Sequence, residues 1–359
     1  MSRILIAAAL LAFSALPAQE SKQLILAARR SGVVEFIDPA TLKTVGRLHL
    51  NLAPNGVGLN GMSVSADGSM LYIEGPTSDS PNMCCSLYSI DLATLETKQE
   101  AGIPGSHSRQ PFLVSDGLVY RVSTLTASGA ITDMNDDRLY LSPDSHWLFG
   151  VRSFRGPALD VYDLGRAKIV RRLTSRNLNG DWFPSGTWSG GRFYFYVGRT
   201  DGSEARLWSL SPDTTQLGEG ISVEPHGQVS GCSQVRLEEI TAASGILFVY
   251  EVFGSKVDRR SGCSSYVPGG AWVLDPPTGR LLQHVAPDLH FWKLIPDRTQ
   301  SELYGLATED SNWNGPVKLA RIDARDGRLL QSRVLDTDFW SMATARVRHA
   351  PTGDVQAVP

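Results

Sequence analysis

The chain has 359 residues, of which 42% are hydrophobic and 20% are charged, and its net charge is −3 at pH 7. This composition is too apolar for an intrinsically disordered protein. The small negative charge excludes a broad electrostatic surface for nucleic acid or for an anionic membrane. We therefore expect a globular protein that binds neither nucleic acid nor a membrane.

Residues 1–18 have the pattern of an export signal. Arg3 supplies the positive start, the run ILIAAALLAFSAL is apolar, and LPA offers a small residue before Gln19. This run is too short to span a bilayer comfortably. We predict that residues 1–18 are removed, that residues 19–359 form one domain, and that the protein is periplasmic or extracellular. A buried first strand or helix is the alternative interpretation.

Along the mature chain, two kinds of turn alternate between apolar, β-branched runs. The first is a short polar turn, as in SVSADGSMLYIEG, and it recurs around Asp67, Asp116, Asp144, Gly190, Ser244 and Asp297. The second is Asp-x-x-Thr or a variant of it, as in FIDPATLKTV and SIDLATLETK. It recurs at Asp38, Asp91, Asp163, Ser211, Asp275 and Asp323. Each turn predicts a β-hairpin, so each repeat holds four strands.

Four-stranded units that repeat along a chain predict a β-propeller, an all-β fold in which each blade covers its neighbour. The N-terminus supplies only the last three strands of a blade, in residues 24–50. The segment WSMATARVR, from Trp340 to Arg348, resembles a lone first strand. We expect these two pieces to pair and to close the ring. The repeat favours seven blades. Six blades follow if residues 105–137, where the Asp-x-x-Thr turn is missing, are only an insertion.

The pattern S-x-D-G-x-x-x-Y followed by Ile-Asp-x-x-Thr resembles the YVTN-type propeller repeats. That superfamily includes the heavy chain of quinone-dependent amine dehydrogenases and a set of lactonase-like propellers. The resemblance covers nearly the whole mature chain at the level of the repeat. The tetrapeptide Tyr-Val-Thr-Asn is absent, and LYIEG, WLFGV and ELYGL stand in its place. The resemblance implies an architecture rather than a chemistry.

Four cysteines remain in the mature chain, and export predicts that they form disulfides. Cys232 precedes the first strand of its blade, and Cys263 follows the second strand of the same blade. Both loops belong on one face, so we predict a Cys232–Cys263 bridge. Cys84 and Cys85 are then left with each other. The cysteine spacing does not match a zinc site.

The loops that precede the first strand of each blade should ring the mouth of the central channel. Two of them read DLHFWKL and DTDFWSM, and two others read GDWFPSGTW and GSHSRQPF. We predict a binding site at this mouth, suited to a small polar or cationic ligand or to a protruding segment of a partner protein. Its residues are His107, Arg109, Asp181, Trp182, Asp288, His290, Trp292, Asp336, Asp338 and Trp340. The alternative is that the Phe-Trp pairs pack between blades and that the Asp residues cap loops.

Catalytic motifs are scarce. The chain has no Gly-x-Ser-x-Gly, no His-Glu-x-x-His and no phosphate-binding loop, and we expect no metal and no cofactor. Three functions remain open: a binding module that acts through the channel mouth, a lactonase-like or other hydrolytic propeller enzyme, and a non-catalytic heavy chain of a quinone-dependent amine dehydrogenase. The missing motifs favour the binding module.

Overall fold

The structure is a computed structural model, and it describes most of the chain. The described residues are 21–29, 31–50, 61–65, 67–77, 80–100, 112–115, 118–121, 138–144, 146–152, 158–166, 168–178, 185–198, 205–211, 216–218, 220–222, 239–250, 257–258, 263–264, 269–309, 315–335 and 338–358. The predicted export signal lies outside them. No described helix has the length and apolar character that a membrane crossing needs.

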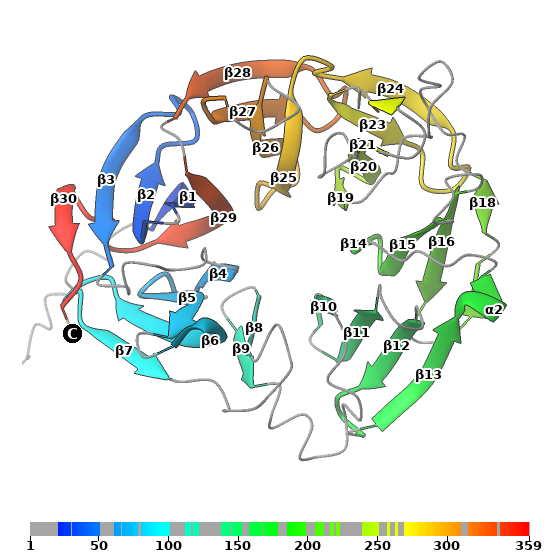
Figure 1. Cartoon of the computed structure of the whole chain (residues 1–359), viewed down its shortest axis with the longest axis horizontal. Helices are drawn as coiled ribbons and strands as arrows, with labels where there is room; N and C mark the ends of the chain where they lie inside the picture. The colour runs from blue at the N-terminus through cyan, green and yellow to red at the C-terminus, as the bar shows by residue number, and fades with distance from the viewer. Residues whose placement is uncertain are drawn as a thin grey trace, which may run out of the picture.

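The described strands form a ring of blades whose inner strands surround a common centre (Figure 1). Five blades follow the chain order from the inner strand to the outer strand. The second blade holds β4 (Gly61–Val64), β5 (Met70–Thr77), β6 (Ser80–Asp91) and β7 (Thr97–Glu100). The third holds β10 (Arg138–Leu141), β11 (Trp147–Arg152), β12 (Ala158–Asp163) and β13 (Lys168–Thr174), and the short α2 (Ser175–Leu178) follows it.

The remaining blades repeat this order. The fourth holds β14 (Gly186–Ser189), β15 (Arg192–Gly198), β16 (Ala205–Ser211) and, on the outer side, β17 (Gln216–Leu217) and β18 (Ile221–Ser222). The fifth holds β19 (Glu239–Ala243), β20 (Ile246–Tyr250), β23 (Ala271–Leu274) and β24 (Leu281–Val285). The sixth holds β25 (His290–Pro296), β26 (Glu302–Thr308), β27 (Lys318–Asp323) and β28 (Leu329–Val334).

The first blade is built from both ends of the chain, as the sequence predicts. Its inner strand is β29 (Phe339–Val347), which pairs with β1 (Lys22–Arg29), and β2 (Val33–Ile37) and β3 (Thr44–His49) follow. An additional strand that the sequence did not indicate, β30 (Gly353–Gln356), pairs in parallel with β3 at the outer edge. Beyond it, Val358 bridges to Glu96 of the second blade. The C-terminus therefore joins the first two blades.

The all-β propeller prediction is confirmed, and the number of blades is six rather than the favoured seven. The expected additional unit is described only as a two-stranded sheet, β8 (Phe112–Ser115) with β9 (Leu118–Arg121). It lies between the second and third blades, against β4 and β5 (Figure 1). A second small sheet joins β21 (Val257–Asp258) to β22 (Cys263–Ser264). The missing Asp-x-x-Thr turn in residues 105–137 was thus the correct signal for six complete blades.

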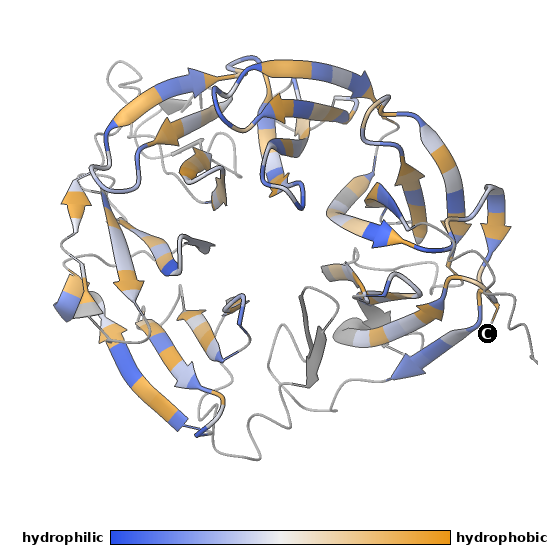
Figure 2. Cartoon of the chain, turned by 180° about the vertical axis from the view of Figure 1, so that it is seen from behind, coloured by the Kyte–Doolittle hydropathy of each residue, from blue (hydrophilic) through white to orange (hydrophobic). Residues whose placement is uncertain are grey.

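Neighbouring blades pack through apolar faces, because one four-stranded sheet cannot cover both of its own faces. Hydrophobic and hydrophilic residues alternate along many of the strands (Figure 2). The third and fourth blades meet through aromatic rings, and the ring centroids of Phe149 and Trp188 lie 4.9 Å apart. The fifth, sixth and first blades share a core cluster that contains Phe248, Phe291 and Phe339. Radial packing therefore supplies the core.

Every strand pair within the six sheets is antiparallel except β3–β30, so the connections divide between two faces. The turns that join the inner strand to the second, and the third to the outer, share one face, which we call the turn face. The connections from the second strand to the third, and from one blade to the next, share the opposite face, which we call the connection face. The predicted mouth belongs to the connection face.

The disulfide predictions fall outside the described part of the protein. Cys84 and Cys85 lie in β6 and Cys263 lies in β22, but only their backbone is described. Cys232 lies outside the described residues. Both pairings therefore stay predictions.

Candidate functional site

At the turn face, the Asp of each of two Asp-x-x-Thr turns accepts hydrogen bonds from residues of its own turn. Asp38 accepts hydrogen bonds from the backbone N–H of Ala40 at 3.1 Å and from the N–H and hydroxyl of Thr41, both at 3.0 Å. Asp91 accepts the N–H groups of Ala93 and Thr94 at 2.8 and 3.1 Å. These two hydrogen bonds hold the pKa of Asp91 below its ordinary value. The repeated Asp is therefore a turn cap.

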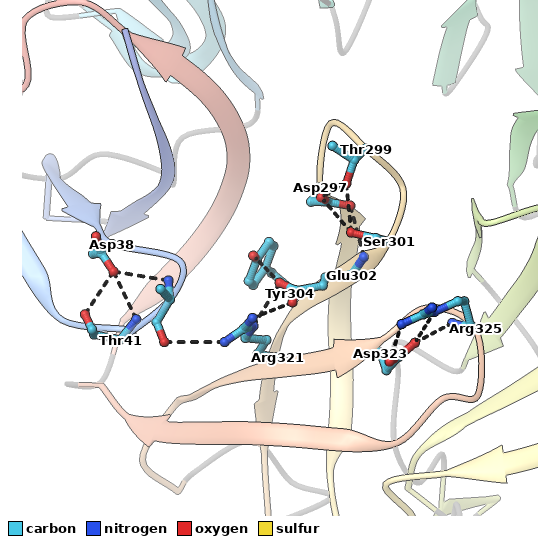
Figure 3. A network of polar contacts seen from close by, with 11 residues as sticks. Asp38, Thr41, Asp297, Thr299, Ser301, Glu302, Tyr304, Arg321, Asp323 and Arg325 are labelled. Carbon is cyan, nitrogen blue, oxygen red and sulfur yellow. Dashed lines mark hydrogen bonds and ion pairs between the residues drawn. The ribbon is translucent and has the colours of Figure 1, made fainter. Parts of the chain in front are cut away.

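The turns between inner and second strands use their carboxylates in the same way. Asp67 accepts the hydroxyl of Ser65 at 2.6 Å and that of Ser69 at 2.8 Å, and these contacts lower its pKa to about 2. Asp297 accepts the Glu302 N–H at 3.0 Å and also the Thr299 hydroxyl (Figure 3). The carboxylates of these turns are thus engaged in holding the backbone.

Hydrogen bonds also connect blades at the turn face. Gln331 of β28 donates to the Thr41 carbonyl at 3.2 Å, and Arg333 of the same strand donates to the Leu42 carbonyl at 2.6 Å. Arg321 of β27 donates to the Ala40 carbonyl at 3.4 Å, beside its ion pair with Glu302 (Figure 3). The sixth blade is therefore hydrogen-bonded to the Asp38 turn of the first blade.

The connection face differs from the turn face, because several of the segments that join its strands are much longer than the turns of the turn face. Residues 101–137, 223–238 and 251–270 separate consecutive strands of the blades there, apart from the small β8–β9 and β21–β22 sheets. On the turn face, β14 and β15 are separated only by residues 190–191, and β25 and β26 only by residues 297–301. Propeller and sandwich scaffolds place recognition in long loops on a rigid framework.

The structure places four predicted mouth residues with their side chains. Asp288 is exposed in the turn that precedes β25, and His290 and Trp292 lie in β25 with only 7% and 9% of their surfaces exposed. Asp338 is exposed at the start of β29, where its φ is +81° and its Oδ2 accepts the Ser31 N–H at 3.3 Å. The two carboxylates therefore lie at the surface, whereas His290 and Trp292 are largely packed.

The repeated Phe-Trp marks a repeated β-bulge. In β25, Phe291 pairs with Ala307 and Lys293 with Leu306, so Trp292 is the additional residue between them. In β29, the residues on either side of Trp340 pair with successive residues of β1, so Trp340 is the additional residue there. A bulge bends its strand and redirects a side chain. Two adjacent blades thus carry the same irregularity at the connection-face end of their inner strands.

Trp292 contacts the core shared by the fifth, sixth and first blades, which supports the packing interpretation for this residue. The remaining predicted residues, His107, Arg109, Asp181, Trp182 and Asp336, lie outside the described residues, and only the backbone of Trp340 is described. The structure therefore brings Asp288, His290 and Trp292 onto one blade and Asp338 onto the next. Within the described residues, no group of three His, Cys, Asp or Glu side chains could hold a metal ion.

No protein-family model matches the chain, and no curated protein matches its sequence. Solved structures resemble its fold. The dihydro-heme d1 dehydrogenase NirN matches with a TM-score of 0.52 and 11% identity, over 92% of this chain and 76% of that one. A quinoprotein alcohol dehydrogenase-like protein from Bacteroides thetaiotaomicron matches with a TM-score of 0.51 and 12% identity, over 90% and 78%. At such identities the likeness shows a β-propeller fold and no activity.

Proposed function

We propose that this protein is an exported, non-catalytic propeller that binds a small polar ligand or a protruding segment of a partner protein at the channel mouth. The observation that carries the proposal is the difference between the two faces. The described carboxylates of the turn face, such as Asp38, Asp67 and Asp91, are engaged in their own turns. The long connections and the two exposed carboxylates of the predicted mouth belong to the other face.

The two bulges support the same location. A bulge next to a strand end is a feature that commonly shapes a binding surface. Here Asp288 precedes one bulge and Asp338 precedes the other, in blades that are neighbours in the ring (Figure 1). The exposed carboxylates suit a cationic group or a hydrogen-bond donor. Export rests on the pattern of residues 1–18 and is part of the proposal.

The test is a paired substitution at the mouth with a matched control. Asp288→Asn and Asp338→Asn remove both charges, and Asn tolerates the positive φ of position 338 better than most residues. The control is Asp354→Asn, a carboxylate that is 60% exposed at the outer edge of the first blade. We expect all variants to melt within a few degrees of the wild type.

The readout is capture from the periplasmic or extracellular fraction of the source cells, quantified by mass spectrometry, together with a thermal-shift screen of small cations and polar metabolites. We expect wild type and D354N to retain the same captured partner or stabilising compound, and the D288N/D338N variant to lose it. Equal retention by all three proteins would show that binding does not use the mouth. Loss of folding in D288N/D338N would show that the carboxylates are structural caps.

A further inference from the structure

The third blade carries a departure from the repeat at its turn face. In the first and fifth blades, the Thr of the Asp-x-x-Thr turn donates its hydroxyl to the turn Asp, as Thr41 does to Asp38 and Thr278 to Asp275. In the third blade the same place is occupied by Arg166, whose side chain is 72% exposed. The Thr hydroxyl that bonds to the turn Asp in the first and fifth blades is therefore replaced in the third blade by an exposed guanidinium.

A hollow of about 320 Å³ opens at this turn, lined by His146, Trp147, Asp163, Gly165 and Arg166. Its one lining carboxylate, Asp163, is 3% exposed and accepts the Arg166 N–H at 2.9 Å. Arg166 Nε lies 3.5 Å from Asp163 Oδ2, and His146 Nε2 lies 3.7 Å from Oδ1. The buried carboxylate thus holds two donor side chains beside one opening.

The position of His146 is fixed on several sides. Its ring meets the Trp147 ring edge-on, with centroids 5.0 Å apart, and its carbonyl accepts the Leu164 N–H at 3.0 Å. Gly165 makes room for the ring, because a Cβ at that position would lie 3.3 Å from His146 Cε1. The imidazole remains 52% exposed. An exposed side chain that is held this firmly is preorganised for a ligand.

The strand that follows the Asp163 turn is basic. Residues 166–176 contain five basic side chains and no acidic one: Arg166, Lys168, Arg171, Arg172 and Arg176. Asp163 and Asp160 offset Arg166 and Arg172, whereas none of the other three forms a salt bridge with another described residue. Hydrophilic and hydrophobic stretches alternate along β13, the outer strand at the lower left of the reversed view (Figure 2). The nearby Asp144 carboxylate accepts the His146 N–H and the Ser142 hydroxyl within its own turn.

We propose that this hollow is a binding site for a small free oxyanion, a phosphate or a carboxylate group, held between His146 and Arg166. The exposed groups at the opening are hydrogen-bond donors, and the one lining carboxylate is buried beneath them. Asp163 acts as the positioning residue, because its buried carboxylate lies within 3.7 Å of His146 Nε2 and 3.5 Å of Arg166 Nε and so keeps both side chains at the opening. The site lies on the turn face and is independent of the proposed mouth.

The experiment is an NMR titration of the folded, full-length mature protein with inorganic phosphate and, separately, with citrate, followed by the indole N–H signal of Trp147, which lines the hollow and is present in every variant. We expect saturable shifts with both anions. Arg166→Gln and His146→Gln should each raise the dissociation constant by about tenfold or more, the loss expected for a charge-assisted hydrogen bond. Gly165→Ala narrows the hollow and retains every charge, so it should also weaken binding.

The matched control is Lys168→Gln together with Arg171→Gln, which removes two nearby charges outside the hollow. It should change the dissociation constant by less than threefold. An equal loss in this control and in R166Q would show diffuse attraction by the basic strand and overturn the site. Shifts that do not saturate, or that G165A leaves unchanged, would also overturn it. Melting temperatures within a few degrees of wild type establish that each variant is folded.

Discussion

Arg172 in β13 donates from Nε and Nη2 to the two carboxylate oxygens of Asp160, directly opposite it in β12, at 2.6 and 2.7 Å. The first blade repeats the arrangement, since Arg47 in β3 donates to Glu35 opposite it in β2 at 3.1 Å. Asp160 is 0% exposed and Glu35 is 1% exposed. In both blades a buried carboxylate on the third strand is paired with an arginine on the fourth strand, and in the first blade Arg29 of β1 pairs with Glu35 as well.

Arg172→Met should therefore destabilise the protein. Removing the bidentate arginine from a buried carboxylate weakens the compensation of its charge, and we expect a loss of about 2–4 kcal/mol in the free energy of unfolding. Urea denaturation at pH 7 measures it. The double variant with Asp160→Asn should recover part of the loss, because the buried charge is then absent as well. A loss below about 0.5 kcal/mol in R172M, the range of ordinary surface changes, would contradict the expectation.

The hydrogen bonds of Glu302 predict that the protein loses stability as the pH falls. Hydrogen bonds from Arg321 and Tyr304 lower its pKa below the ordinary value of 4.5, although burial acts in the opposite direction. A carboxyl group with a depressed folded-state pKa stabilises the protein above its unfolded pKa, and this contribution disappears as the pH falls through the folded value. Wild type should therefore lose stability between about pH 5 and pH 3.

Glu302→Gln should show a shallower decline over that window, and urea midpoints at pH 7, 5, 4 and 3 measure it. Asp354→Asn is the control, because that carboxylate is 60% exposed and should leave the decline almost unchanged. Parallel curves for wild type and E302Q would show that the Glu302–Arg321 pair does not contribute to the acid transition.

Two truncations distinguish the roles of the C-terminal strands. Deletion of residues 338–359 removes β29, the inner strand of the first blade, and exposes the edge of β1. We expect loss of cooperative unfolding of the whole ring. Deletion of residues 351–359 removes only β30 and the Val358 bridge, and should lower the melting temperature by a few degrees. Calorimetry measures both, and an unchanged melting temperature in the longer deletion would refute closure by β29.

Gly46→Ala should release the C-terminal strand while the blades persist. A Cβ at this position would lie 1.9 Å from the Pro351 carbonyl oxygen, so the segment that carries β30 must move. We expect faster carboxypeptidase digestion of the C-terminus and a modest fall in melting temperature. Gly191→Ala is the control, because its φ is +74° but nothing lies within 4 Å of an added Cβ. Equal digestion of both variants would count against the packing of β30 on β3.

The turn chemistry explains why the fold could be predicted from sequence. The Asp side chain, the following N–H groups and the Thr hydroxyl interact within a few residues, as at Asp38 and Thr41, so a local pattern contains the whole cause. Closure by residues 340–348 was predictable for a related reason: the N-terminal unit lacks only its first strand, and the C-terminal segment supplies one such strand. The structure confirms it through the pairing of β1 with β29.

The features that the sequence did not indicate depend on distant contacts. In four blades the outer strand carries a bulge at the same place after the turn, at Val45, Val170, Leu282 and Leu330. A bulge is defined by its partner strand, so its own residues look like ordinary strand residues. The parallel β30 likewise depends on β3, far away in the chain. The hollow at His146 could not be predicted from sequence, because it forms only where the turn that contains His146 lies beside the turn that contains Asp163.

The pairing of Lys22–Arg29 with Phe339–Val347 sets an order for assembly. The first blade is begun before the other five and is completed after them, because its inner strand β29 follows all of their strands in the chain. Until then the buried residues Leu24, Ile25 and Leu26 belong to a strand with an open edge. Contacts between such distant segments form slowly, and unpaired apolar edges aggregate during the delay. Strand β1 of this protein therefore needs shielding while the strands of the other five blades are synthesised.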